Sequence, residues 1–163
     1  MPTHEELNRS GMDFYKQGKF AEAIEAYEAA IALKPDHVPS YINLTLAYLK
    51  KSRPDDALRV AVKAAELAPA NGAVRNNLGN AQNAKGRWNE AATAYSRAWD
   101  IDKSQLNAIF MAGALCMDNG VDAKAIGFLK DYLAAAPAEH PRRKEAEERL
   151  ATLEGGSSLI QRY

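Results

Sequence analysis

Residues 72–105 read GAVRNNLGNAQNAKGRWNEAATAYSRAWDIDKSQ, and this stretch decides the fold. Gly86 divides it, and glycine ends a helix because it adopts the left-handed conformation without strain. Gly79 and Ala91 lie one on each side of the break, where small side chains let two helix backbones approach closely. The stretch therefore predicts two helices joined by a tight turn.

The same types of residue recur at equivalent positions every 34 residues along the chain. Four series share this interval: a helix-stop position, an alanine position, an apolar position and a proline position. They are Gly18, Ser52, Gly86 and Gly120; Ala23, Ala57, Ala91 and Ala125; Leu33, Leu67, Ile101 and Ala135; and Pro35 and Pro69, followed by Lys103 and Pro137. Four series in one register indicate four repeats of one helix pair, whose apolar faces are buried only when neighbouring pairs stack. The 31 alanines among 163 residues also favour helix over sheet.

This pattern resembles the tetratricopeptide repeat, a helix–turn–helix unit of 34 residues. The resemblance covers residues 4–37, 38–71, 72–105 and 106–139. The third repeat matches best, through Leu78-Gly79, Gly86-Arg87-Trp88, Ala91 and Tyr95. The resemblance implies an all-α fold, a right-handed superhelical solenoid of antiparallel helix pairs with about nine helices.

The chain after Pro137 is predicted to close the solenoid. A capping helix is expected at residues 140–154, with Pro141 at its first position and Ala146, Leu150 and Leu153 on one apolar face. Gly155-Gly156-Ser157-Ser158 reads as a flexible break, so residues 155–163 are expected to form a flexible tail.

Composition excludes several classes of protein. Lys plus Arg and Asp plus Glu are both 21, and this zero balance argues against nucleic acid as a partner. No apolar run is long enough for membrane insertion, and the N-terminal residues lack the features of a secretory signal. The single cysteine, Cys116, excludes an internal disulfide framework. A cytoplasmic location is the expectation.

No constellation of residues predicts chemistry. His4, His37 and His140 fall near the N-terminus or unit boundaries, without a partner at metal-ligand spacing. Asp55-Asp56 reads as a charge pair at a helix start, and Cys116 as a buried structural thiol. The sequence therefore predicts no catalytic residue, no metal and no cofactor, and the chain is not expected to be an enzyme.

The resemblance implies a concave face, lined by the first helix of each repeat, that binds peptides. The residues expected to contact a peptide there are Arg9, Met12, Tyr15, Lys16, Asn43, Leu46, Lys50, Asn76, Asn77, Asn80, Asn107, Phe110 and Met111. Asparagine amides can pair with both N–H and C=O of an extended backbone, and methionine adapts to varied apolar side chains. The alternative is a structural role: repeat scaffold for Asn43, Asn77 and Asn80, and seam core for Met12 and Leu46.

One subfamily can be compared residue by residue. Chaperone-binding members clamp an acidic C-terminus with Lys, Asn, Asn, Lys and Arg. The matching places here hold Asn8, Met12, Asn43, Ala73 and Asn77, of which only Asn43 agrees. Because every positive charge is missing, the chain is not expected to be a typical Hsp70/Hsp90 C-terminal tail binder. Arg9, Lys16 and Lys50 could still favour a mildly acidic segment.

The predicted function is a protein–protein interaction module or adaptor, which binds an extended or helical segment of another protein in its concave groove. The alternative is a structural scaffold that self-associates into a homo-oligomer, through the ends of the solenoid or through its C-terminal tail.

Overall fold

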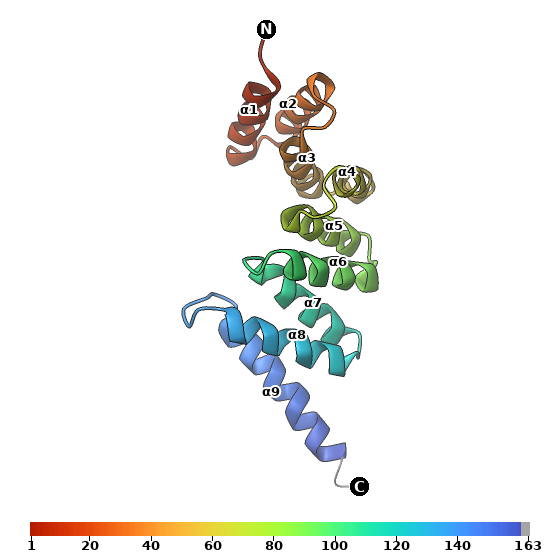
Figure 1. The fold of residues 1–163 in the computed structure, drawn as a ribbon, viewed down its shortest axis with the longest axis vertical. Coiled ribbons are helices and arrows are strands. Elements are labelled where there is room, and N and C mark those ends of the chain that lie inside the picture. Colours follow the sequence, from red (N-terminus) through yellow and green to blue (C-terminus); the bar gives the residue numbers. More distant parts are fainter. Residues whose placement is uncertain (161–163) are drawn as a thin grey trace.

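The computed structural model describes residues 1–160, and within them the chain forms nine helices and no strand. The helices are α1 (His4–Lys16), α2 (Phe20–Leu33), α3 (Val38–Lys50), α4 (Pro54–Leu67), α5 (Gly72–Ala84), α6 (Trp88–Ile101), α7 (Leu106–Asp118), α8 (Asp122–Ala135) and α9 (Arg143–Ile160). Each predicted repeat contains one antiparallel pair, beginning with α1 and α2 (Figure 1). The predicted all-α solenoid is confirmed.

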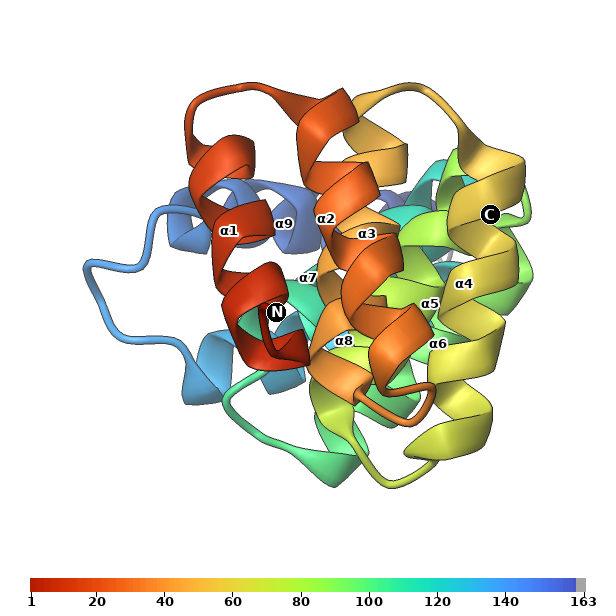
Figure 2. The same cartoon turned by 90° about the horizontal axis from the view of Figure 1, so that it is seen from above.

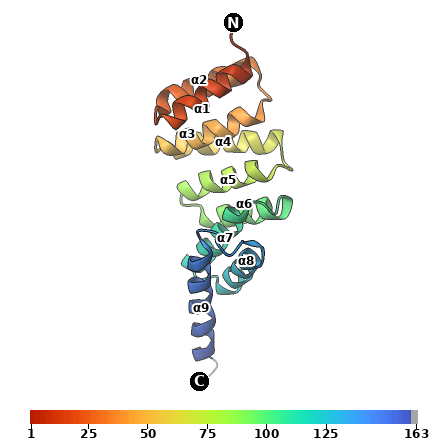
Figure 3. The same ribbon diagram turned by 90° about the vertical axis from the view of Figure 1, so that its left-hand side faces the viewer.

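The pairs stack in chain order, so the two ends of the chain lie at opposite ends of an elongated molecule (Figure 1). The view from the side shows these layers one above another (Figure 3). Seen from above, successive pairs are rotated relative to one another, so that the stack winds about its long axis (Figure 2).

The first helices of the repeats form the inner row of the stack. Direct contacts join α1 to α3, α3 to α5 and α7 to α9, whereas no comparable contact joins one second helix to the next. A curved stack brings its elements closest together on the concave side. The contacts therefore place α1, α3 and α5 on the concave side; α7 is the equivalent first helix of its repeat, and α2, α4, α6 and α8 lie outside.

Within a pair, the two helices approach most closely where a glycine faces a large side chain. A Cβ atom added to Gly11 would lie 2.5 Å from Cε1 of Tyr27. One added to Gly79 would lie 2.7 Å from Cδ1 of Tyr95. Carbon atoms in contact are normally about 3.5 Å apart or more, so only glycine fits at these positions without movement. Gly11 and Gly79, which lie on the first helices of their pairs, are thus sites of close helix packing, whereas Gly18, Gly86 and Gly120 end the first helices.

The second repeat departs from this pattern at two places. Thr45 takes the place of the glycine on the first helix, and Ala61 takes the place of the large residue on the second. Both are fully buried, so in this repeat the larger side chain comes from the first helix. The Thr45 hydroxyl donates to the Tyr41 carbonyl at 2.8 Å, which satisfies it inside the core. At the turn, Ser52 has a φ of 54° where the other repeats have glycine. This left-handed conformation costs a serine about 1 kcal/mol or more.

The capping helix α9 packs its predicted apolar face against the last repeat. Ala146 is fully buried and Leu153 is 7% exposed. Two expectations are corrected: α9 begins at Arg143 rather than at Pro141, and it continues to Ile160 through the predicted flexible break. Glycine costs a helix interior about 1 kcal/mol relative to alanine, which does not stop a helix that several turns already support. The rest of the predicted tail, residues 161–163, lies outside the described residues.

Polar side chains join the first two repeats. The Ser40 hydroxyl and the Asn43 amide both donate to the side-chain oxygen of Asn8, each at 3.1 Å. Since the single hydroxyl hydrogen of Ser40 goes to Asn8, the 2.7 Å contact with Nδ1 of His37 makes the imidazole the donor. Burial lowers the pKa of His37, and the neighbouring His4 ring lowers it further.

Gly79→Ala is expected to lower the free energy of unfolding by about 1–3 kcal/mol, because the added methyl group must displace the Tyr95 ring. Gly127→Ala is the matched control, since a Cβ there would meet nothing within 4 Å and alanine is the better helix former. Urea unfolding followed by circular dichroism measures both variants. Equal destabilisation by the two substitutions would contradict the packing account.

The free energy of unfolding is also expected to decrease as the pH is lowered, because His37 titrates. Its pKa is lower in the folded chain than the ordinary value of 6.5, so the unfolded chain binds the proton more readily. The contribution is fully present above that ordinary value and is lost as pH falls through it toward the folded pKa. His37→Gln keeps a donor for Ser40 but cannot titrate, so its unfolding midpoint should depend less on pH in this range. An unchanged pH dependence in denaturant titrations would count against this assignment.

Candidate functional site

A small pocket on the inner face brings together five of the residues predicted to contact a peptide. Its volume is about 120 Å³, and it is lined by Met12, Tyr15, Lys16, Tyr27, Asn43 and Leu46. Met12, Tyr15 and Lys16 come from the last turns of α1, while Asn43 and Leu46 come from the middle of α3. The pocket therefore spans the seam between the first two inner helices and has room for about one aliphatic side chain.

The two phenols of this pocket are uncharged. Burial raises the pKa of Tyr15, and it is the largest cause that raises the pKa of Tyr27 to about 12. The Tyr15 ring is oriented by an edge-to-face contact with Phe20, at 5.2 Å between centroids. Lys16 is consequently the one charged residue in the lining, at the rim of an otherwise neutral and largely apolar pocket.

Three exposed cations on the inner helices have no anionic partner within the described chain. They are Arg9, Lys16 and Lys50, none of which takes part in an ion pair. On the outer helix α4, by contrast, Arg59 lies 3.2 Å from Asp56. The N-terminal part of the inner face therefore offers positive charge that the chain does not neutralise by direct pairing.

The predicted asparagine ladder is largely engaged within the protein. Asn77 is 7% exposed and donates to the Ile42 carbonyl at 3.4 Å. Asn80 donates to the Asn77 side-chain oxygen at 3.4 Å and accepts from the Tyr95 hydroxyl at 2.8 Å. These two amides hold α5 against α3 and α6, so the expectation that Asn77 faces a ligand is corrected. Half-buried Asn76 and exposed Asn107 make no side-chain hydrogen bond with the residues that the structure describes.

Two of the three predicted binding residues of the fourth repeat, Phe110 and Met111, lie against the segment that leads into α9. Phe110 is 1% exposed, with the Arg142 guanidinium 4.8 Å from its ring centre and the Tyr132 ring on another side. Met111 receives a guanidinium N–H of Arg142 on its sulfur at 3.5 Å. The expectation that Phe110 and Met111 take ligand side chains is therefore corrected, because the segment leading into α9 occupies that surface.

Sequence reasoning missed three residues of this inner surface. Tyr27 is 1% exposed, yet it also lines the pocket. Arg142 and Arg149 belong to the capping segment, of which only the apolar face was predicted. Arg149 pairs with Asp118 of α7 at 3.1 Å and with Glu145 at 3.0 Å. Arg142 precedes α9, so helical spacing in the sequence offered no signal for its contact with Phe110.

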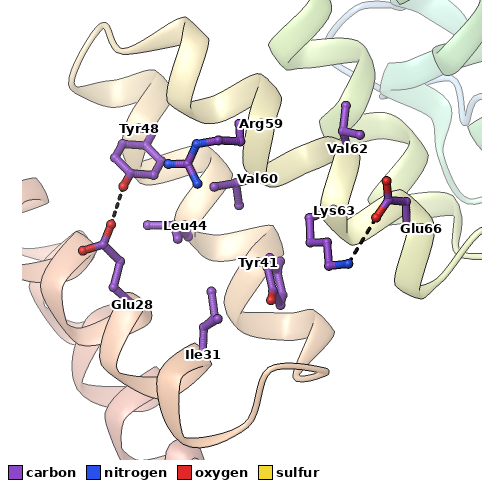
Figure 4. Close-up of a pocket in the computed structure, with 10 residues that line it drawn as sticks. All are labelled: Glu28, Ile31, Tyr41, Leu44, Tyr48, Arg59, Val60, Val62, Lys63 and Glu66. Carbon is purple, nitrogen blue, oxygen red and sulfur yellow. Dashed lines mark hydrogen bonds and ion pairs between the residues drawn. The ribbon is translucent and has the colours of Figure 1, made fainter.

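A second kind of hollow lies on the outer side, between one second helix and the next. Between α2 and α4 it has a volume of about 440 Å³, and Ile31, Leu44 and Val60 point into it (Figure 4). Its polar groups pair among themselves: the Tyr48 hydroxyl donates to Glu28, and Lys63 lies 3.2 Å from Glu66 (Figure 4). This hollow leaves few charges for a ligand.

Two further findings concern the described part of the chain. It contains no group of three or more His, Cys, Asp or Glu side chains placed to hold a metal ion. None of its helices has the length and apolarity needed to cross a bilayer. Cys116 is 2% exposed, which confirms the predicted burial, and burial raises the pKa of its thiol.

Two known repeat families match the sequence. A TPR repeat matches residues 11–52, and a tetratricopeptide repeat matches residues 42–105. A small glutamine-rich tetratricopeptide repeat-containing protein 2 from Mycosarcoma maydis is 31% identical over 100 residues, covering 61% of this chain and 28% of that protein. An Hsp70-Hsp90 organising protein from Plasmodium falciparum is 27% identical over 153 residues, covering 92% of this chain and 23% of that protein. The chain thus spans about a quarter of these relatives.

Solved structures agree on the fold. The crystal structure of a MamA protein superimposes with a TM-score of 0.83 at 21% identity, over 98% of this chain and 85% of that chain. The first TPR domain of Spaghetti (RPAP3), bound to the HSP90 peptide SRMEEVD, superimposes with a TM-score of 0.70 at 21% identity, over 72% of this chain and 96% of that one. Together with the repeat register and the matched family descriptions, these likenesses show that the chain belongs to the tetratricopeptide repeat family.

Proposed function

We propose that the chain is a non-enzymatic interaction module that binds a segment of another protein on the inner face of its first two repeats. The observation that carries this proposal is the pocket of Met12, Tyr15, Lys16, Asn43 and Leu46, with Arg9 and Lys50 unpaired on the same helices. An apolar pocket with a few polar groups at its rim is the common form of a binding site.

The pocket suits an aliphatic side chain. Met12 is 40% exposed and flexible, and Leu46 and the Tyr15 ring complete an apolar wall. Full burial of a side chain such as valine or leucine contributes about 1.5–3 kcal/mol. Such a residue would anchor the ligand at the seam between α1 and α3.

The surrounding charges suit an acidic ligand. A carboxylate beside the anchor residue would pair with Lys16, and others along the segment with Arg9 and Lys50. Charge-assisted hydrogen bonds of this kind are stronger than neutral ones. Asn43 gives one amide hydrogen to Asn8 and keeps a second one for a ligand carbonyl.

The relatives support a peptide ligand of this chemistry. The RPAP3 domain is bound to SRMEEVD, which contains carboxylates next to a valine. For this chain we infer an acidic stretch within a partner rather than a free C-terminus. Ala73 supplies no charge at a clamp position, and Asn77 is buried between repeats.

A random-peptide display selection on the whole chain is expected to enrich sequences with an aliphatic residue flanked by Asp or Glu. Leu46→Ala should weaken an enriched peptide by about 1–2 kcal/mol through lost apolar contact. Lys16→Gln with Lys50→Gln should weaken it and reduce its dependence on salt. Isothermal titration calorimetry at two salt concentrations measures both effects.

Val62→Ala is the matched control, because Val62 is 43% exposed on the outer helix α4 and should leave the affinity unchanged. Enrichment of peptides that bind all of these variants equally would refute the inner-face site. The sequence-based alternative, self-association through the solenoid ends or the tail, stays a prediction, which light scattering over a range of concentrations tests.

A further inference from the structure

We propose that the outer groove between α6 and α8 is a second docking surface, and that its occupant is an amphipathic helix of a partner protein with oppositely charged ends. This groove has a volume of about 510 Å³ and shares no lining residue with the pocket of the first two repeats. It is thus independent of the proposed peptide site.

The floor of the groove is apolar and open. Partly buried Trp88 and Phe128 line it, with Ala92 and Cys116 almost fully buried beneath. Gly127 on α8 leaves space above this floor, since a Cβ there would meet nothing within 4 Å. The equivalent positions of the other repeats hold Glu25, Arg59 and Thr93, so the fourth repeat alone presents no side chain there.

The shape of the groove fits a helix better than a single side chain. Its lining follows α6 from Trp88 to Asp100 and α8 from Lys124 to Asp131. At 1.5 Å per residue, the α6 wall is about 18 Å long, or about three helical turns. The two walls run in the same direction, because each is the second helix of its pair. A partner helix can therefore lie lengthwise between them, with its apolar stripe on the floor.

The charges at the rim determine what that helix must carry. Arg97, Lys124 and Asp131 form no ion pair and no side-chain hydrogen bond within the described chain. The groove between α2 and α4 differs, since its lysine and its tyrosine hydroxyl are paired internally. Arg97 and Asp131 are 34 residues apart, so they hold equivalent positions on α6 and α8. The two walls of the groove therefore carry opposite charges at the same height along the helices.

Along α8 the charge changes sign within two turns. Lys124 lies near the N-terminal end and Asp131 seven residues later, about 10 Å along the axis. The helix dipoles have the same sense, positive at the N-termini and negative at the C-termini of α6 and α8. An antiparallel partner helix is favoured, with a lysine or arginine on its α8 side against Asp131 and away from Arg97, and a glutamate or aspartate seven residues later against Lys124. Apolar residues three and four positions after this lysine or arginine would then lie over Phe128 and Ala92.

A charge-swap experiment tests this arrangement. The probe is a fluorescein-labelled helical peptide of about fourteen residues. It contains a lysine, two leucines three and four positions after that lysine, and a glutamate seven positions after it. A second peptide has the lysine and glutamate exchanged. The native chain is expected to bind the first more tightly, by about tenfold in fluorescence anisotropy. The Lys124→Glu/Asp131→Lys variant should prefer the second peptide, and both residues are exposed and unpaired, so its fold should persist.

Gly127→Leu should abolish binding of both peptides, because its side chain fills the groove. Ala123→Leu adds the same bulk on an exposed part of α8 outside the lining and should not. Leu46→Ala on the inner face should have no effect here, so failure of this proposal is distinguishable from failure of the peptide site. Absence of binding by either peptide, or a preference that the swapped variant does not invert, would overturn the proposal.

Discussion

The close approach of the two helices within each repeat is the constraint on which the rest of the structure depends. At Gly11 and Gly79 nothing larger than hydrogen fits against the tyrosine ring opposite. In the second repeat the small residue is Ala61 on the second helix, and the larger one is Thr45 on the first helix. Because every pair packs this closely, each presents a similar surface to the next, and the stack can continue until α9 covers its last apolar face.

This stacking divides the polar residues of the inner face into two groups. Asn77 and Asn80 satisfy hydrogen bonds between repeats, so their conformations are fixed by the fold itself. Arg9, Lys16 and Lys50 make no such bonds and project from helices that the packing holds rigid. An apolar pocket held between two packed helices is a preorganised surface, which reduces the entropy lost when a ligand binds.

Much of this could be predicted from the sequence, because the glycine series records where the first helices end, and Gly79 and the alanine series record where backbones must approach. The helix pairs and the meeting of α1 with α3 residues follow from that register. The covering of Phe110 could not be predicted, since it depends on the path of the turn before α9 and on one arginine. Nor could the burial of Asn77, because the same repeat position in Asn43 lines an open pocket. Helix propensity at Gly155-Gly156 was overridden by the helix already formed before it.

The most direct test of the central claim is the location of a bound peptide. Methyl groups of Met12 and Leu46 can be followed by carbon-13 NMR while an enriched acidic peptide is added, with the methyl groups of Val62 as the outer-face reference. The account predicts that the Met12 and Leu46 resonances shift in proportion to occupancy and that Val62 does not move. Shifts confined to Val62 and its neighbours, with Met12 and Leu46 unchanged at saturation, would contradict it.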